Sequence, residues 1–188
     1  MTSPSDPLEA GLLLGESLDQ AGIPYAIGGA LAYGIWGIPR ATIDVDINIF
    51  VEPEDLDPVL DVLTELGIAV DRKSAHVKAE TDGMFVARWG LFRIDLFTPS
   101  IDFSWEAFHS RSAHEIEGRR AWFLSAEAIA VFKLLFFRGK DIVDLERLLA
   151  VQGPALDVAY IREKLVEMMG KDDERVIKWD RLVAAANV

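Results

Sequence analysis

Two carboxylates, Asp44 and Asp46, are the residues of this sequence whose type and spacing most directly suggest chemistry. They lie in the segment IDVDINIF, residues 43–50, where apolar residues alternate with polar ones. Such alternation is typical of a strand with one buried face, so both acids are expected on its polar face. Two like charges placed side by side need a cation, and Mg²⁺ binds one or two carboxylates together with substrate phosphates. Exposed acids on the polar side of a sheet are the other interpretation.

A third acid, Asp95, has the same placement in another predicted strand. In the segment LFRIDLF, residues 91–97, it alternates with Ile94 and Leu96 and is therefore expected opposite the apolar side chains. In that position Asp95 is a candidate metal ligand, or the base that takes a proton from an attacking hydroxyl.

Gly28 and Gly29 lie between a predicted short strand, residues 24–29, and a predicted short helix, residues 30–37. Backbone N–H groups at such a helix start form an anion site, although a Gly-Gly pair can also be a simple tight turn. The sequence contains neither a Walker loop nor the spacing of a Rossmann fingerprint. A phosphate site beside a pair of metal-binding acids indicates a nucleoside triphosphate (NTP).

Lys133 is the one charged residue of the apolar segment AIAVFKLLFF, residues 128–137. Its ammonium either reaches water along the helix surface or has an anionic partner, for which a triphosphate and Asp144 are the two candidates. Asp141 and Asp144 are also suited to capping and to the first turn of the next helix. Arg40 and Thr42 precede the acid pair, where they contact phosphate or fix the entrance of the strand.

The elements that must position these residues follow from periodicity, caps and breakers. Helices are predicted over residues 7–21, 30–37, 53–66, from 104, 126–138, 141–151, 157–169 and 173–186, and strands over residues 24–29, 43–50, 68–71, 76–80, 84–89, 91–97 and 121–124. A hairpin is expected in which Thr81-Asp82-Gly83 turns into the strand at residues 84–89 and Gly90 leads to the strand at residues 91–97.

Composition indicates one domain, alone or with a helical appendage, since the chain has 188 residues and is 51% hydrophobic. The lack of cysteine excludes disulfides, thiolate nucleophiles and Cys-ligated zinc. No apolar run reaches the roughly 18 residues of a membrane span, and the first residues do not resemble a signal peptide. A soluble, cytoplasmic protein with no membrane partner is expected.

The net charge of −12 argues against a protein that coats nucleic acid, because phosphates are bound by Lys and Arg. The charge is unevenly distributed. Residues 1–70 contain twelve acids and one base, whereas residues 72–93 contain five bases and two acids. An anionic substrate is therefore expected to approach the middle of the chain, where Arg88 and Arg93 lie.

Residues 28–47 resemble the nucleotidyltransferase signature hG[GS] followed by DhDh, in which two acids and a later third one bind magnesium and an NTP. More narrowly, Arg40-Ala-Thr42-Ile-Asp44-Val-Asp46, with Lys133, Arg138-Gly-Lys140-Asp141 and Asp144, is similar to the AbiEii-type abortive-infection and MenT-type toxin nucleotidyltransferases. The similarity covers Tyr25 to Leu149.

The resemblance implies an α+β fold with a mixed β-sheet flanked by helices. Residues 1–115 would form the nucleotidyltransferase core, and residues 116–188 a mainly helical C-terminal region that completes the NTP site. Asp44, Asp46 and Asp95 would bind Mg²⁺, Asp95 would also activate the acceptor hydroxyl, and Lys133 would be a fourth catalytic residue. The implied NTP-binding residues are Gly28, Gly29, Arg40, Thr42, Lys133, Lys140 and Asp144.

The implied reaction is transfer of a nucleoside monophosphate to an acceptor hydroxyl with release of pyrophosphate. In the toxin relatives the acceptor is the 3′ end of tRNA, translation is blocked, and a separately encoded antitoxin counters the toxin. Two alternatives remain open. One is an enzyme that modifies an aminoglycoside or lincosamide antibiotic, since an acidic surface suits a cationic substrate. The other is a degenerate domain that only binds.

Overall fold

The computed structural model describes residues 3–187, which form two compact units. Within those residues, unit 1 comprises the chain up to Leu31 together with Ala41–Leu124. Unit 2 comprises Ala32–Arg40 and the chain from Ser125 onward. Helix α2 (Gly29–Trp36) begins in unit 1 and continues in unit 2.

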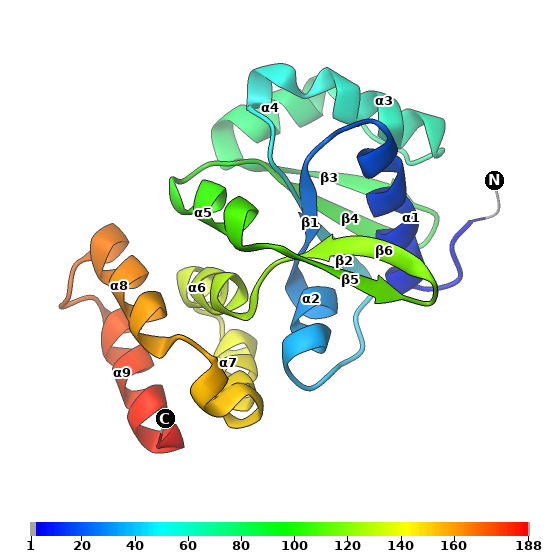
Figure 1. Cartoon of the computed structure of the whole chain (residues 1–188). Helices are drawn as coiled ribbons and strands as arrows, with labels where there is room; N and C mark the ends of the chain where they lie inside the picture. Colours follow the sequence, from blue (N-terminus) through cyan, green and yellow to red (C-terminus); the bar gives the residue numbers. More distant parts are fainter. Residues whose placement is uncertain (1–2, 188) are drawn as a thin grey trace. The chain divides into compact units, whose positions relative to one another are not determined.

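Unit 1 is built on a six-stranded sheet in the order β3-β4-β2-β1-β6-β5 (Figure 1). The pairs β1–β6 and β2–β4 are parallel and the other three pairs are antiparallel. This mixed sheet with flanking helices confirms the predicted α+β class. The strands are β1 (Tyr25–Ile27), β2 (Asp44–Ile49), β3 (Met84–Trp89), β4 (Phe92–Phe97), β5 (Ser112–Ile116) and β6 (Arg119–Phe123).

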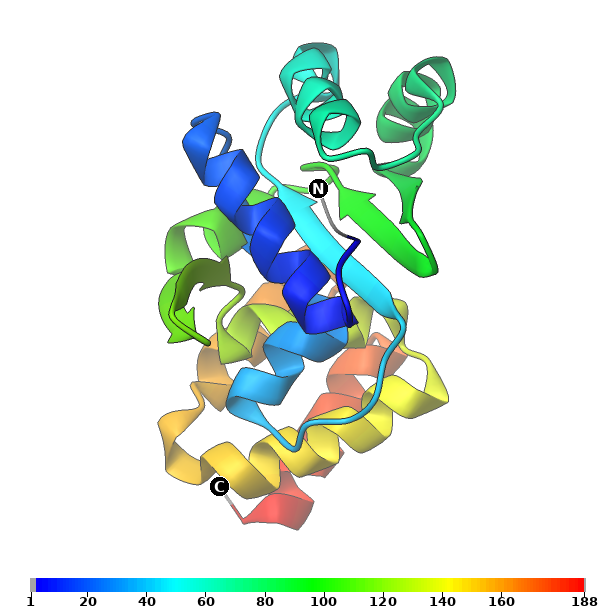
Figure 2. The ribbon, with the colours of Figure 1, turned by 90° about the vertical axis from the view of Figure 1, so that its right-hand side faces the viewer.

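Helix α1 (Pro7–Gln20) covers the apolar face of the sheet, over β1, β2 and β6 (Figure 2). Asp6 caps its N-terminus, because the Asp6 carboxylate accepts a hydrogen bond from the N–H of Glu9 at 2.9 Å. Gly11 of α1 faces β2, because an added Cβ would lie at an ordinary contact distance, 3.5 Å, from the Val45 side chain. The apolar residues of β2 therefore point toward α1, and the acids of β2 point to the opposite face.

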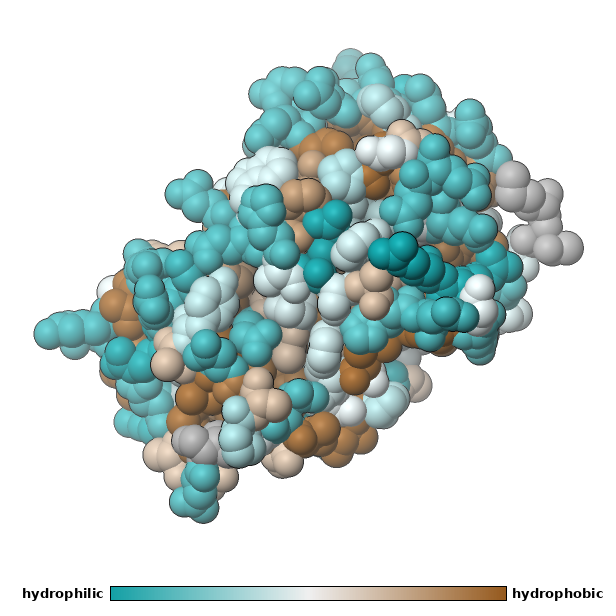
Figure 3. Space-filling model, viewed as in Figure 1, coloured by the Kyte–Doolittle hydropathy of each residue, from teal (hydrophilic) through white to brown (hydrophobic). Residues whose placement is uncertain are grey.

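The other helices of unit 1 are η1 (Pro53–Asp55), α3 (Asp57–Glu65), α4 (Arg72–Asp82) and α5 (Phe103–Ser110). The single helix predicted from Pro53 is divided, since a 3₁₀ turn precedes α3, in which Pro58 occupies the first turn. On the face seen in Figure 3, hydrophilic side chains cover α3 and α4.

The strand predicted over residues 76–80 is wrong, because these residues belong to α4. The alternation of Val77 and Ala79 with charged residues imitates a strand. The Asp71 carboxylate caps the helix by accepting from the Ser74 N–H at 3.0 Å, and the buried face is formed by Ala75 and Ala79, four residues apart. Val77 is exposed. The strand predicted over residues 68–71 is reduced to one bridge, from Ala69 to Arg88.

Strand β5 was not predicted, since the sequence indicated only one strand here, at residues 121–124. In the structure β5 pairs antiparallel with β6 at the edge of the sheet. None of its side chains is fully buried, so the hydrophobic alternation that reveals a strand is absent.

Unit 2 contains α6 (Ala126–Phe136), α7 (Gly139–Gln152), η2 (Gly153–Ala155), α8 (Val158–Met169) and α9 (Glu174–Ala186). Helix α6 packs against α7, α8 and α9, and α9 also contacts α7 and α8. The predicted starts at Ser125 and Asp173 are confirmed, since both side chains cap the helix that follows. Among residues 3–187, no helix is long and apolar enough to cross a bilayer.

Candidate active site

Three acids of unit 1 lie on one face of the sheet, which we call the carboxylate face. Asp44 and Asp46 belong to β2, and Asp95 belongs to the parallel neighbour β4. In the register of these strands Asp46 pairs with Asp95, and Asp44 pairs with Arg93. Residues paired in this way have side chains on the same face, so strand pairing brings together three acids that are up to 51 positions apart in the sequence.

Arg93 also lies on the carboxylate face, two residues before Asp95 on β4. Its Nε donates to Asp95 Oδ1 at 2.6 Å. This hydrogen bond and the charge of Asp95 raise the pKa of Arg93 above its usual value, and Asp44 and Asp46 add to the effect. The sequence alone indicates that Arg93 and Asp95 are neighbours, because residues two apart on a strand share a face.

Gly28 and Gly29 lie directly against side chains of β2. The Gly28 N–H donates to the backbone oxygen of Asp46 at 2.8 Å, so this amide is already engaged. Gly29 has φ +52°, and a Cβ at this position would collide with the Asp46 carboxylate. Glycine is therefore required at position 29 both by the backbone and by the close approach of Asp46. The N-terminus of α2 carries backbone N–H groups of the kind that bind anions at helix starts.

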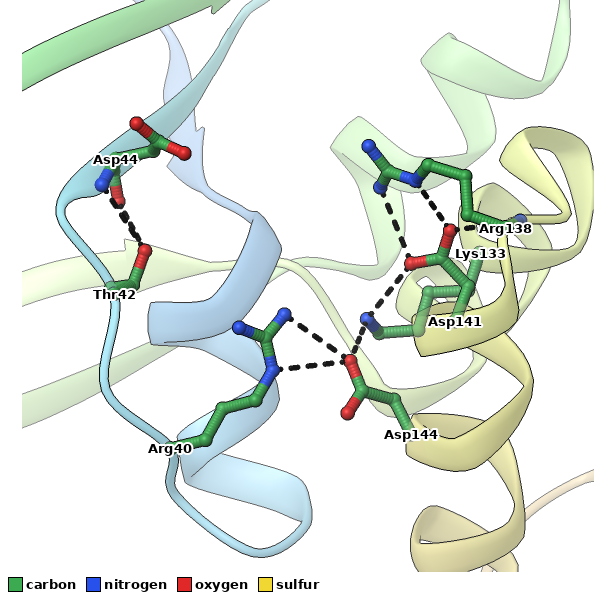
Figure 4. Close-up of polar contacts among 7 residues, drawn as sticks. All are labelled: Arg40, Thr42, Asp44, Lys133, Arg138, Asp141 and Asp144. Carbon is green, nitrogen blue, oxygen red and sulfur yellow. Dashed lines mark hydrogen bonds and ion pairs between the residues drawn. The ribbon is translucent and has the colours of Figure 1, made fainter.

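Thr42 fixes the start of β2. Its hydroxyl accepts from the Asp44 N–H and donates to the Asp44 carbonyl oxygen, both at 3.1 Å (Figure 4). Of the two roles considered for Thr42, the structure thus provides the one at the strand entrance. This bond restricts the backbone that carries the Asp44 side chain.

The chemistry of this donor set fits magnesium in part. Asp44 and Asp46 are hard oxygen donors on one face, and Mg²⁺ is commonly held by one or two carboxylates while its other ligands are waters and phosphates. Within residues 3–187, no three His, Cys, Asp or Glu side chains are gathered closely enough to hold a metal ion. Asp95, the third expected ligand, is instead held by Arg93.

A second group of charged residues lies in unit 2, around the buried Lys133. Its Nζ is 2.6 Å from Asp144 Oδ2 and 3.6 Å from Asp141 Oδ1 (Figure 4). The Arg40 guanidinium also donates to Asp144 Oδ2, at 3.3 Å, and Arg138 Nε donates to Asp141 at 2.6 Å. The anionic partner required by the Lys133 ammonium is therefore supplied by the protein itself.

Positive and negative charges alternate in this group, and Asp141 is fully buried between two cations. Burial by itself raises the pKa of Asp141, but the hydrogen bond from Arg138 and the charge of Lys133 outweigh that effect and hold the pKa below its usual value. Asp141 also accepts from the Arg138 N–H at 3.2 Å, so it caps α7 from inside its first turn.

The predicted phosphate-binding residues of unit 2 thus differ in availability. The Lys133 side chain is buried, with its Nζ 5.0 Å from the centre of the Tyr33 ring, a cation–π contact that the sequence did not reveal. Arg40 is partly exposed, and Lys140 is exposed in the first turn of α7. Lys140 makes no ion pair with a described residue.

No protein-family model and no curated protein matches this sequence, but solved structures do. An antigenic nucleotidyltransferase-like protein from Paracoccidioides brasiliensis matches with a TM-score of 0.51 and 16% identity, over 94% of each chain. The antibiotic-resistance factor ANT(2″)-Ia in solution matches with a TM-score of 0.51 and 20% identity, over 96% of this chain and 89% of that one.

The crystal structure of ANT(2″)-Ia in complex with adenylyl-2″-tobramycin matches with a TM-score of 0.50 and 20% identity, over 96% of this chain and 95% of that one. At such identities the similarity establishes the fold and leaves the substrate open. The chain has the fold of the nucleotidyltransferases.

Proposed function

We propose that this protein is a magnesium-dependent nucleotidyltransferase that moves a nucleoside monophosphate from an NTP to an acceptor hydroxyl. The observation that carries the proposal is the carboxylate face, in which Asp46 pairs with Asp95 and lies against Gly29 at the start of α2. The fold supports the same class of reaction.

In this reaction the acceptor oxygen bonds to the α-phosphorus of the NTP, and the bond from that phosphorus to pyrophosphate breaks. Asp44, Asp46 and Asp95 would hold Mg²⁺, and Asp95 would also take the proton of the acceptor hydroxyl. When bound, Mg²⁺ neutralises phosphate charge and aligns the reacting groups. Backbone amides from Gly29 onward donate to phosphate oxygens, and Thr42 keeps the Asp44 backbone in place.

For unit 2 we propose that Arg40 and Lys140 contact the triphosphate and that Lys133 and Asp144 act as positioning residues. Asp144 accepts from both Arg40 and Lys133 and so orients these two cations. The buried Lys133 faces two carboxylates, which makes it a positioning residue in this proposal, whereas Arg40 and Lys140 present their charges to solvent.

The acceptor that we favour is the 3′ end of tRNA. Arg88 of β3 pairs directly with Arg93 of β4, which adds a second cation to the carboxylate face, diagonal to Asp95. An anionic acceptor suits this arrangement, because like charges directly opposite each other are destabilising unless an anion joins them. We therefore propose a toxin that modifies tRNA and blocks translation, countered by a separately encoded antitoxin.

A second acceptor is favoured by the overall charge. Unit 1 has twenty acids and eight bases, whereas unit 2 has eleven of each, so the whole net charge of −12 belongs to unit 1. A negative surface attracts cations over long distances at low ionic strength. A cationic aminoglycoside or a lincosamide is therefore the alternative acceptor.

The test is transfer of label from each α-³²P-labelled NTP, with Mg²⁺, to total tRNA or to a panel of these antibiotics. Label on tRNA alone supports the toxin proposal, and label on an antibiotic alone supports the alternative. The Asp46→Asn protein is expected to lose at least about 100-fold in rate. The metal would lose a carboxylate ligand, and the phosphate charge would be neutralised less well.

The matched control is Asp55→Asn, which removes the same charge from an exposed position in η1. Full activity in Asp46→Asn would reject the metal assignment. If the wild-type protein transfers no label to any acceptor, the transferase proposal fails and a binding role takes its place.

A further inference from the structure

Arg93 is a cation of the carboxylate face that lies next to one acid of β2 and next to the acid of β4. It pairs with Asp44 across the two strands and donates to Asp95 on its own strand. Asp46, two residues after Asp44 on β2, lies opposite Asp95. One guanidinium thus interacts electrostatically with three carboxylates.

The contact between Arg93 and Asp95 can be broken without unpacking the core. The Arg93 side chain is 46% exposed, whereas that of Asp95 is 14% exposed, so the arginine reaches the carboxylate from the solvent side. Exposed ion pairs contribute little to stability, because water competes for both partners. A divalent cation has twice the charge of the guanidinium, so it competes more strongly than water for the Asp95 carboxylate oxygens.

We propose that Arg93 is a built-in counter-ion of the carboxylate face, which holds Asp95 until a divalent cation displaces the guanidinium. The proposal rests on the proposed function, since it takes the three acids as the metal site. It explains why the structure has Asp95 on the correct face and yet no gathered set of three metal ligands. Once released, Arg93 lies opposite Arg88, where an anionic substrate would join the two.

The proposal predicts that Arg93 weakens the binding of metal in the absence of nucleotide. Mn²⁺ serves as the probe, and free Mn²⁺ is measured by electron paramagnetic resonance during titration of the nucleotide-free protein. Arg93→Gln is expected to bind Mn²⁺ about tenfold more tightly than wild type, because a positive charge a few ångströms from the ion is removed. The gain must vanish in the double variant Arg93→Gln/Asp46→Asn.

Arg88→Gln is the matched control, because it removes the same charge from the same sheet face, one strand further from Asp44 and Asp46. Its Mn²⁺ affinity is expected to change by no more than about twofold, since screening reduces the more distant effect. An equal gain in both variants, or no gain in Arg93→Gln, overturns the proposal. So does the absence of Mn²⁺ binding to both wild type and Arg93→Gln.

Thermal unfolding gives a second measurement. In EDTA, Arg93→Gln is expected to unfold at a lower temperature than Arg88→Gln, because the three carboxylates then lose the nearby charge of Arg93. Addition of Mn²⁺ should reverse the order. If Arg93→Gln does not fold in EDTA, Arg93→Lys provides the test. Lysine keeps the charge without the Nε donor that binds Asp95, so Arg93→Lys should bind Mn²⁺ more tightly than wild type does. An affinity equal to that of wild type overturns the proposal.

These outcomes are separate from those of the transfer assay. Label transfer by the wild type, together with equal Mn²⁺ affinities in wild type and Arg93→Gln, would reject the role of Arg93 alone. Tighter Mn²⁺ binding by Arg93→Gln in a protein that transfers no label would reject the reaction and leave the counter-ion in place.

Discussion

Replacement of Asp144 by Asn is the sharpest test of the charged group in unit 2. Asp144 is almost fully buried and accepts from Lys133 Nζ at 2.6 Å and from Arg40 at 3.3 Å. Asparagine has nearly the same shape, so the substitution removes the charge and leaves the packing. The buried Lys133 ammonium then depends on Asp141, whose nearest oxygen is 3.6 Å away.

The magnitude follows from burial. Breaking a buried ion pair by removing one partner costs about 3–5 kcal/mol, because an uncompensated charge remains in the interior. The lower end applies here, since Asp141 and the asparagine oxygen still face Lys133. The contact with Arg40 adds at most about 1 kcal/mol, because that side chain is partly exposed. For a chain of this size, a loss of about 3 kcal/mol lowers Tm by about 6–12 °C.

The assay is urea unfolding followed by circular dichroism, with a double-mutant cycle between Asp144→Asn and Lys133→Met. The double variant is expected to recover most of the loss, because neither charge of the Lys133–Asp144 pair remains and Asp141 keeps its bond from Arg138. Glu146→Gln, an exposed acid on the same helix, is the control and should change stability by less than about 0.5 kcal/mol. A loss below about 1 kcal/mol in Asp144→Asn, or no recovery in the double variant, would refute the reasoning.

Two further predictions concern Gly29 and Asp141. Gly29→Ala should reduce label transfer and destabilise the protein by more than Gly22→Ala, because both positions have positive φ but only at Gly29 would the new Cβ strike Asp46; equal losses in thermal unfolding and transfer would contradict this. The folded-state pKa of Asp141 is depressed, so its ionised form stabilises the native state above the unfolded value of about 3.9, and this contribution is lost as pH falls through the lower folded value. Asp141→Asn should therefore flatten the decline of urea stability below about pH 4, and an unchanged decline would exclude Asp141 as its source.

Much of the carboxylate face could be predicted because alternation along a strand is a local property. Val45 and Ile47 are buried, so Asp44 and Asp46 must point the other way, and the same reasoning places Asp95. Helix caps are equally local, which is why the starts of α6 and α9 were predicted to within a residue.

Local patterns predicted the wrong element where a helix and a strand can have the same sequence pattern. In residues 76–80 polar and apolar side chains alternate as in a strand. The segment is nevertheless helical, because Asp71 caps the helix and Ala75 and Ala79 form one buried helix face. Strand β5 buries no complete face, so its residues carry too weak a pattern to be recognised without the partner β6. In both cases packing against the rest of unit 1 decides between alternatives that the local sequence leaves open.

The sequence by itself determined which groups are available to the candidate site: oxygen donors at Asp44, Asp46 and Asp95, glycines before a helix, and a lysine within an apolar segment. Only the tertiary structure decided how they are paired. Strand register sets Asp46 opposite Asp95, and helix packing gives Lys133 its partner Asp144. The bond between Arg93 and Asp95 joins near neighbours, but its meaning depends on the acids that β2 brings beside it. Charges interact through space, and the distances between them are set by the fold.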